Sequence, residues 1–493
     1  MITFLVSIVL LVLGYVFYGR LVEKVFGANP SNQVPAKTMA DGVDYVEMPT
    51  WKVFLVQFLN IAGLGPIFGA VMGAMYGPAC FLWIVIGSIF GGAVHDYFSG
   101  MISVRRKGAS LPEIDGAYLG KGMHHFLRII SPLLLVMVCA VFISGPADIL
   151  HGLVPSVEKM WWLVIVFAYY VIATLLPIDK LIGKIYPFFG LLLLFMAVGI
   201  LFVLVKTWAP VPEITEGLAS RHPKGYPLFP MMFVSIACGA VSGFHATQSP
   251  LMARCIANEK YGRKCFYGAM IVEGVVALVW AAAASSFLFK NPSSEGPALV
   301  GLNDFVSSLP QGTNPDALAV NEICRTWLGR IGGVLAVLGV VMAPISTGDT
   351  ALRSARLMVA DMFHFNQDKI WRRLALTAPL IALVVLLLRL DFSVIWRYFA
   401  WSNQTLAAIT LWAISIYLVR EKKCFWIALI PAMFMTAVST TFLFYANECG
   451  IRPGLAGIGV DLTIEWCYLI AGVVVASLTC WFFVRNRPFA SGR

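Results

Sequence analysis

The chain has 493 residues, of which 59% are hydrophobic and only 13% are charged; a soluble protein carries about 25% charged residues. This composition excludes an ordinary soluble enzyme. It predicts an all-α polytopic membrane protein, because the apolar residues come in runs of roughly 20, enough to cross a bilayer core. The net charge of +10 is expected to set orientation in the membrane rather than to bind nucleic acid.

Thirteen apolar segments are long enough to be transmembrane helices. In chain order they are about 2–18, 51–72, 80–103, 126–144, 161–178, 184–206, 227–247, 266–288, 330–348, 374–390, 393–418, 424–444 and 463–484. No charged stretch precedes the first segment, so we expect a retained span rather than a cleaved signal peptide.

Lysine and arginine residues are concentrated in alternate loops. With the N-terminus placed outside, the inner loops hold 24 of them and the outer loops nine. Basic residues accumulate on the cytoplasmic side of membrane proteins. We therefore predict a multi-pass chain with its N-terminus outside and its C-terminus in the cytoplasm.

The second span contains a stretch that cannot continue as a regular helix. Gly63 and Gly65 weaken the helix, and Pro66 removes a hydrogen-bond donor. Irregular backbone survives in hydrocarbon only where protein or a polar cavity satisfies it. Broken spans are typical of secondary transporters, which bind their solutes there. A second break is predicted in span seven, at 242–250.

The positions of the two breaks predict an inverted repeat. Spans two to six and seven to eleven are each five helices long and each begin with a broken helix, and an odd number of spans reverses the second set in the membrane. The predicted parts are an extra helix and cytoplasmic loop at 1–50, a first repeat at 51–206, a second repeat at 207–420 with an outer loop at 289–329, and two extra helices at 421–493.

The two breaks supply the predicted substrate site. The positive ends of half-helices would hold a carboxylate, and polar side chains would orient the solute. The predicted substrate-binding residues are Asn60, Ala62, Gly63, Gly65, Ser242, His245 and Gln404. His245 has an alternative role, since an imidazole can hydrogen-bond freed carbonyls. Gln404 lies in a polar cluster, 401–405, whose amides can also join helices.

Acidic residues inside spans are expensive and are therefore functional candidates. Asp96, Glu273 and Asp349 are the predicted carriers of a coupling proton. The alternative for Asp96 and Glu273 is a buried structural acid with a polar partner. Asp349 can instead pair with Arg353, one helical turn further on.

A hydroxyl pair in span nine offers a different coupling ion. Ser346 and Thr347 share a helix face with Ala343. Facing the loose carbonyls near Ala62 and Gly63, they would complete an oxygen cage for sodium. The alternative is that these hydroxyls bond their own backbone and pack helices.

A metal site and a nucleotide site have less support in the sequence. His95, Asp96 and His245 are candidate metal ligands, but two histidines and an acid on two spans have little specificity. The glycine patterns of nucleotide-binding loops are absent. No cofactor is therefore predicted beyond a coupling ion, H⁺ or Na⁺.

Several short motifs resemble the carbon starvation protein A family. They are Asp41–Tyr45, Ile61–Pro66, Gly92–Tyr97, Ile102–Arg106, Ser242–Ala246, Tyr267–Met270, Glu273–Gly274 and Ser402–Ala408. They extend over most of the chain, and they are specific as a set rather than singly.

The resemblance implies an inner-membrane importer of peptides, or of pyruvate in some relatives, used when preferred carbon runs out. It also implies the fold of the sodium-coupled leucine transporters, in which the helix equivalent to span nine carries a similar hydroxyl pair. We therefore predict a secondary importer, not an enzyme, in the bacterial plasma membrane. Its partners are the lipid bilayer and a small peptide or pyruvate-like solute; no sequence feature predicts an oligomeric state.

Other functional classes stay open at this point. A divalent metal or other cation transporter on the same fold is the nearest alternative. A channel also needs polar groups at depth, whereas a sensor would need a signalling domain that is not visible. A membrane enzyme would use His95 and Asp96 as an acid–base pair.

Overall fold

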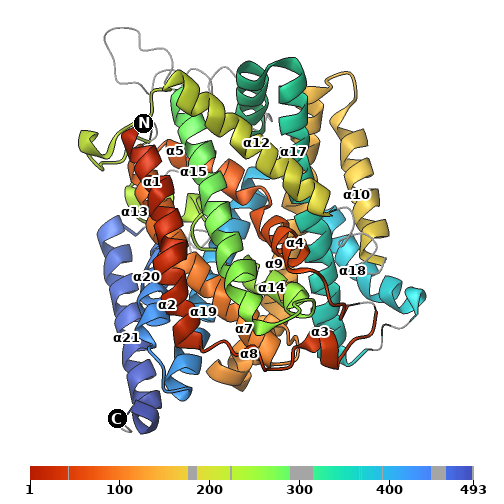
Figure 1. Cartoon of the computed structure of the whole chain (residues 1–493), viewed down its shortest axis with the longest axis vertical. Helices are drawn as coiled ribbons and strands as arrows, with labels where there is room; N and C mark the ends of the chain where they lie inside the picture. Colours follow the sequence, from red (N-terminus) through yellow and green to blue (C-terminus); the bar gives the residue numbers. More distant parts are fainter. Residues whose placement is uncertain are drawn as a thin grey trace.

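The computed structural model describes residues 1–493 except 43, 176–185, 223–224, 289–314, 366, 368, 391, 446–461 and 491–493. Within these residues the chain is helical, with no strand (Figure 1). The predicted all-α membrane fold is confirmed.

The N-terminal half of the chain contains both long helices and short helical segments. They are α1 (Ile2–Leu13), η1 (Gly14–Tyr18), α2 (Gly19–Phe26), α3 (Pro35–Thr38), α4 (Thr50–Ala62), η2 (Gly65–Gly69), α5 (Ala70–Ala74), α6 (Ala79–Ile86), η3 (Gly87–Gly92), α7 (Ala93–Arg105), α8 (Leu111–Leu119), α9 (Lys121–Leu153), α10 (Lys159–Leu175), α12 (Tyr186–Thr207) and η4 (Ile214–Glu216).

The C-terminal half follows the same pattern. Its segments are α13 (Leu228–Ser235), α14 (Phe244–Ala253), η5 (Glu259–Tyr261), η6 (Arg263–Tyr267), α15 (Gly268–Leu288), α17 (Pro315–Phe363), α18 (Ile370–Leu387), α19 (Phe392–Arg420), α20 (Trp426–Phe444) and α21 (Ile464–Ala490).

Each predicted span contains helical structure among its described residues, but the count of thirteen is not confirmed. By length and composition, ten helices of the described chain can cross a membrane, and the bent pair of α4 with η2–α5 makes eleven. The apolar part of α10 is shorter than a full span, and α13 and α14 are separated by residues 236–243.

The second part of the predicted outer segment at 289–329 is helical. Residues 315–329 form the first turns of α17, and the helix direction changes at Gly329, where φ is +68°. Ala317, Val320 and Cys324 are buried there, so this stretch has the i, i+3, i+7 pattern of a helix with one packed face. The rest of that loop, 289–314, lies outside the described residues.

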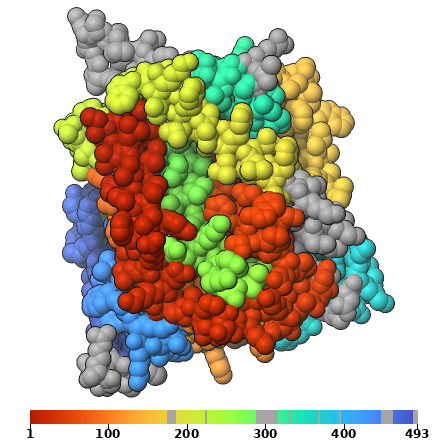
Figure 2. Space-filling model, in the orientation of Figure 1, coloured from red at the N-terminus to blue at the C-terminus, as the bar shows by residue number. Residues whose placement is uncertain are grey.

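The broken helices lie in the middle of the bundle, and apolar helices surround them. α1, α18 and α21 bury little of their surface, and α1 and α2 cross one face of the molecule (Figure 2). Large apolar side chains such as Ile2 and Phe17 are more than half exposed on that face. Such a perimeter suits lipid, because lipid tails cover apolar side chains at no cost.

The two broken helices run in opposite directions. α4 packs against α14, and α5 packs against α13 (Figure 1). Since α4 precedes α5 whereas α14 follows α13, the two broken helices are antiparallel. This arrangement agrees with the inverted repeat expected from the sequence, and the repeat itself stays a prediction.

Candidate functional site

The first break is a sharp bend that only glycine accommodates. α4 ends at Ala62, and Gly63 has φ +35° and ψ −141°, a conformation that L-residues rarely adopt. A Cβ on Gly63 would lie 2.7 Å from the ring of Phe142. The chain resumes as η2, and the two helix axes meet at 56°. The predicted break is therefore present at the predicted glycine.

The second break is longer than the first. α13 ends at Ser235, residues 236–243 are non-helical, and α14 begins at Phe244. The break thus begins several residues before the predicted 242–250, most of which forms α14. The proline of that stretch, Pro250, lies inside α14 and does not end it.

The two breaks pack directly against each other. A Cβ on Gly65 would lie 2.0 Å from Cβ of Cys238, and one on Gly69 would lie 2.7 Å from the carbonyl oxygen of Ser235. Glycine on the first broken helix therefore lets the backbone of the second approach closely.

The backbone groups freed by the second break are bonded by neighbouring helices. Trp83 Nε1 donates to the carbonyl of Ile236 at 3.3 Å, and Ser88 Oγ donates to that of Gly239 at 3.1 Å. Buried backbone groups left without partners would cost stability, so these helices, α6 and η3, hold the break in shape.

The polar cluster at 401–405 hydrogen-bonds the backbone at both helix ends of the second break. The Asn403 side-chain oxygen accepts from the N–H of Phe244 at 2.6 Å, and its carbonyl accepts from the N–H of Gly243 at 3.2 Å. Gln404 Nε2 donates to the carbonyl of Phe233 at 3.1 Å. The positive end of α14, predicted to hold a carboxylate, is thus capped by Asn403 in this conformation.

Three helices, α7, α14 and α15, bring four titratable side chains together at the second break. His95 Nδ1 lies 2.8 Å from one oxygen of Asp96, and His245 Nδ1 lies 2.9 Å from the other. His245 Nε2 lies 3.6 Å from an oxygen of Glu273. All four side chains are fully buried. We call this set the histidine–carboxylate chain.

Several polar atoms at the site have no hydrogen-bond partner among the described residues. They are both oxygens of Glu273, Nε2 of His95 and of His245, and the oxygen and nitrogen of the Asn60 amide. Buried polar atoms are normally bonded, and unpaired ones point to a ligand, an ion or water that another state supplies.

The other predicted residues bond to protein. Thr347 Oγ1 donates to the carbonyl of Leu59 at 2.7 Å, next to the first break, whereas Ser346 Oγ donates to Ala343 of its own helix at 2.7 Å. Asp349 accepts a hydrogen bond from Tyr186. Of the predicted hydroxyl pair, only Thr347 reaches the broken helix.

The structure thus joins Asp96, His95, His245 and Glu273, and it places Asp349 with Tyr186 in a separate contact. Ser242 bonds Asn403, with 3.1 Å between its Oγ and the amide oxygen. Asn403 belongs to the polar cluster at 401–405, and its amide joins helices, one of the two roles expected for the amides of that cluster. The sequence analysis did not single out Trp83, Ser88 and Tyr186, because serine and aromatic residues are common in membrane helices.

Nothing in the described chain is arranged like a metal centre. No group of three or more His, Cys, Asp or Glu residues in that part is spaced to hold an ion. The two Nδ1 atoms of the candidate ligands His95 and His245 both face Asp96, and their hydrogen bonds use both oxygens of its carboxylate.

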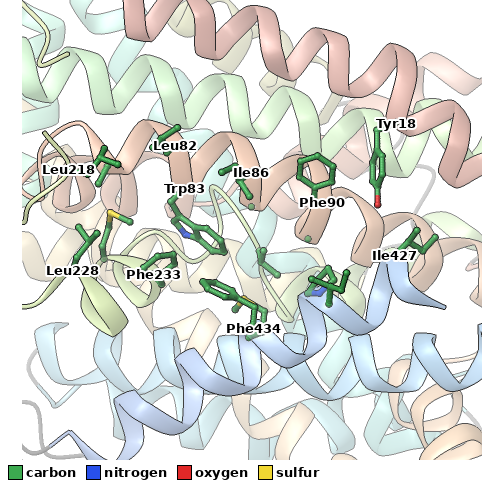
Figure 3. A pocket seen from close by; sticks show the side chains of 18 of the residues that line it. Tyr18, Leu82, Trp83, Ile86, Phe90, Leu218, Leu228, Phe233, Ile427 and Phe434 are labelled. Atoms are coloured by element: carbon green, nitrogen blue, oxygen red, sulfur yellow. The ribbon is translucent and has the colours of Figure 1, made fainter. Parts of the chain in front are cut away.

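The apolar cavity shown in Figure 3 is not this site. It has a volume of about 480 Å³ and lies between α6–η3, α13 and α20, with Leu82, Phe90, Phe233 and Phe434 among its lining residues. The predicted binding residues do not line it. An apolar lining suits a hydrocarbon chain and not a charged solute.

Comparison with known proteins gives a family match over most of the chain. The model of the family described as Carbon starvation protein CstA matches residues 1–156, 147–319 and 317–442. The Escherichia coli protein named Peptide transporter CstA is 26% identical, with 88% of this chain and 79% of that protein covered. Its Bacillus subtilis namesake is 25% identical, with 98% and 97% covered. A Haemophilus influenzae membrane protein is 42% identical over 60% of this chain and 93% of its own length.

Solved structures with a similar fold are membrane transporters. A manganese transporter of Eremococcus coleocola superposes with a TM-score of 0.57 at 16% identity, covering 92% of this chain and 99% of that chain. This likeness concerns the fold. Together with the relatives, it supports a transporter role.

Proposed function

Because the chain belongs to the carbon starvation protein CstA family, we propose that it is an ion-coupled secondary importer of peptides or pyruvate-like small carboxylates. It works in the bacterial inner membrane, with its N-terminus outside and its C-terminus in the cytoplasm. The names of the relatives from Escherichia coli and Bacillus subtilis favour peptides. A transporter that moves its solute intact needs no catalytic group, so enzymatic activity is not part of the proposal.

One observation carries the proposal: two antiparallel broken helices meet at their breaks, and unpaired buried polar atoms lie beside them. The Asn60 amide, with neither of its polar atoms bonded among the described residues, offers a donor and an acceptor to a peptide-like group. The solute would form the hydrogen bonds that the Asn60 amide lacks, once the second break separates from the side chains that bond it in this structure.

The histidine–carboxylate chain supports a proton as the coupling ion. When each Nδ1 donates to Asp96, the Nε2 of a neutral histidine has no proton. His245 Nε2 and the Glu273 oxygen, 3.6 Å apart, can then share one proton. Its loss leaves Glu273 charged and unpaired in a fully buried site, a costly state, so protonation favours the arrangement in which Glu273 is buried. Coupling follows if the solute favours the same arrangement, because the effect of each site on the other is reciprocal.

The geometry gives less support to sodium and to a divalent metal. Of the hydroxyl pair, only Thr347 bonds the broken helix, whereas Ser346 bonds its own helix, as hydroxyls that pack helices do. A metal bound by all three of His95, Asp96 and His245 would use the carboxylate whose two oxygens already bond the two imidazoles.

The test is uptake of labelled dipeptide and labelled pyruvate into vesicles that contain the purified protein, with pH and sodium gradients imposed separately. We expect a pH gradient to drive accumulation of the dipeptide. In Glu273→Gln, which keeps the shape and removes the titration, accumulation should fall to the level reached without a gradient. Glu47→Gln, on an exposed loop residue, is the matched control and should transport normally. No uptake of either solute under any gradient contradicts the proposed function.

A further inference from the structure

A second cavity, which is polar, lies where three helices end. Its volume is about 530 Å³, within the roughly 300–1,000 Å³ of small-molecule sites. The residues that directly follow α7 and α14 line it together with the end of α17, towards the end of the molecule where α8 lies (Figure 1). Its lining residues are Tyr45, Lys107, Gly108, Ala109, Glu113, Arg128, Arg254, Ala360, Asp361, His364 and Phe365.

Charges of both signs in this cavity are left without a bonded partner. Arg254 is only 8% exposed; its Nε donates to the carbonyl of Gly108 at 3.0 Å, and its guanidinium lies 5.1 Å from the ring centre of Tyr45. Its two terminal nitrogens, the Lys107 ammonium and the Asp361 carboxylate make no hydrogen bond or ion pair with any residue that the structure describes. A buried guanidinium with free N–H groups is a receptor for a carboxylate.

The remaining charges of the cavity are already paired or lie at its edge. Arg128 and Glu113 form an ion pair at 3.5 Å. α17 ends at the cavity, with Asp361 in its last turn, and a helix C-terminus carries partial negative charge. Asp361 and this helix end make one part of the cavity favourable to a cation. Arg254 and Lys107 make another part favourable to an anion.

We propose that this cavity is a second solute site for molecules that carry both an ammonium and a carboxylate group, such as short peptides with free ends. The carboxylate binds Arg254 and Lys107, and the ammonium group binds Asp361. A pyruvate-like anion leaves Asp361 unsatisfied and binds more weakly. That the molecule is a peptide rests on the proposed function. That it carries both an ammonium and a carboxylate group follows from the charges of the cavity alone.

α14 connects this cavity with the breaks. His245 lies in its first turn, and Arg254 follows its last residue, Ala253. α4 and α14 lie on the same side of the two breaks. A solute that is released towards that side would pass along α14 to the cavity. A second site there would hold it before it leaves the protein.

The test uses Lys107 as a reporter in the full-length purified protein. Acetylation of Lys107 by an amine reagent is measured by mass spectrometry relative to Lys121, an exposed lysine at the start of α9. The added molecules are Ala-Ala, Ala-Ala amide, N-acetyl-Ala-Ala and pyruvate. Because Ala-Ala and its amide consume the reagent equally, the amide is the matched control. We expect Ala-Ala alone to lower the Lys107 to Lys121 ratio severalfold.

Asp361→Asn should abolish this protection, whereas Glu421→Gln, on an exposed acid beyond α19, should keep it. An unchanged ratio with Ala-Ala, or an equal effect of the amide, overturns the proposal. Failure of the two proposals can be told apart. Protection of Lys107 without peptide uptake by vesicles supports this second site and contradicts the proposed transport function. Peptide uptake without protection of Lys107 supports the transport function and contradicts the second site.

Discussion

At the scale of single residues, the buried acids differ in how their charge is satisfied. Asp96 uses both carboxylate oxygens on two imidazoles, whereas the Glu273 oxygens have no hydrogen bond within the described structure. Position inside an apolar span was enough to predict each of Asp96, His245 and Glu273 as a candidate. His95, Asp96 and His245 were grouped only as candidate metal ligands; their hydrogen bonds and the contact with Glu273 were not predictable, because His245 and Asp96 are 149 residues apart in the chain and only the packing of α7 on α14 joins them.

Asp115 is a buried acid that the sequence analysis missed, because it lies in α8, between two spans. Burial raises the pKa of its carboxyl to about 7 from an ordinary 3.8, and the hydrogen bond from Thr410 lowers it only in part. Between about pH 4 and pH 7, Asp115 is therefore protonated in the folded protein but ionised in the unfolded chain. The free energy of unfolding should fall as the pH rises from about 4 to about 7.

Asp115→Asn mimics the protonated acid and should remove this pH dependence. Its melting temperature in detergent should vary less than that of the wild type between pH 5 and pH 8. At pH 8 the variant should be more stable by about 4 kcal/mol, since the pKa is raised by about three units and each unit corresponds to about 1.4 kcal/mol. Glu47→Gln, on an exposed loop, serves as the control and should follow the wild type. A variant with the wild-type pH profile would show that Asp115 is ionised in the folded protein.

At the scale of elements, glycine and proline predicted where the helices break but not what holds the breaks. Gly63 and Gly65 have a local reason, visible in the sequence: a bend and a close approach. The extent of the second break depends on α6, η3 and α19, which bond its free carbonyls and N–H groups. Such partners come from distant parts of the chain, and for this reason the predicted boundary was several residues late.

Gly65→Ala tests the contact between the two breaks. Its Cβ would lie 2.0 Å from Cβ and 2.5 Å from Sγ of Cys238, so the two backbones must separate. We expect a loss of stability of about 1–3 kcal/mol, the usual cost of overpacking, and a large loss of uptake. Thermal unfolding and vesicle uptake measure the two effects.

Gly122→Ala is the matched control, because a Cβ on Gly122 meets nothing within 4 Å. It should leave stability and uptake unchanged. The double variant Gly65→Ala/Cys238→Gly removes the colliding atom and should recover part of the lost stability. Full stability of Gly65→Ala alone would mean that the breaks do not pack as described.

At the scale of the whole molecule, the direction of the chain through the membrane is the main untested prediction. Hydropathy located the long apolar helices but not the number of spans, because α10 is short and α13 and α14 are separated. The two ends of α1–α2 define opposite ends of the molecule. The N–H of Ile2 donates to Glu213 at 2.9 Å, whereas Lys423 bonds the carbonyl of Phe26. The loop before α13 and the turn before α20 therefore lie on opposite sides.

Cys424, exposed in the turn before α20, makes this orientation measurable. The basic residues around it predict the cytoplasmic side. In a Cys449→Ser background, a membrane-impermeant thiol reagent should label Cys424 in inside-out vesicles and not in intact cells. The described cysteines other than Cys424 and Cys480 are buried, and Cys480 lies on the apolar helix α21. Thr215→Cys, at an exposed position near Glu213, should show the opposite pattern. Labelling of Cys424 in intact cells would reverse the topology, and with it the direction in which a solute passes from the breaks along α14.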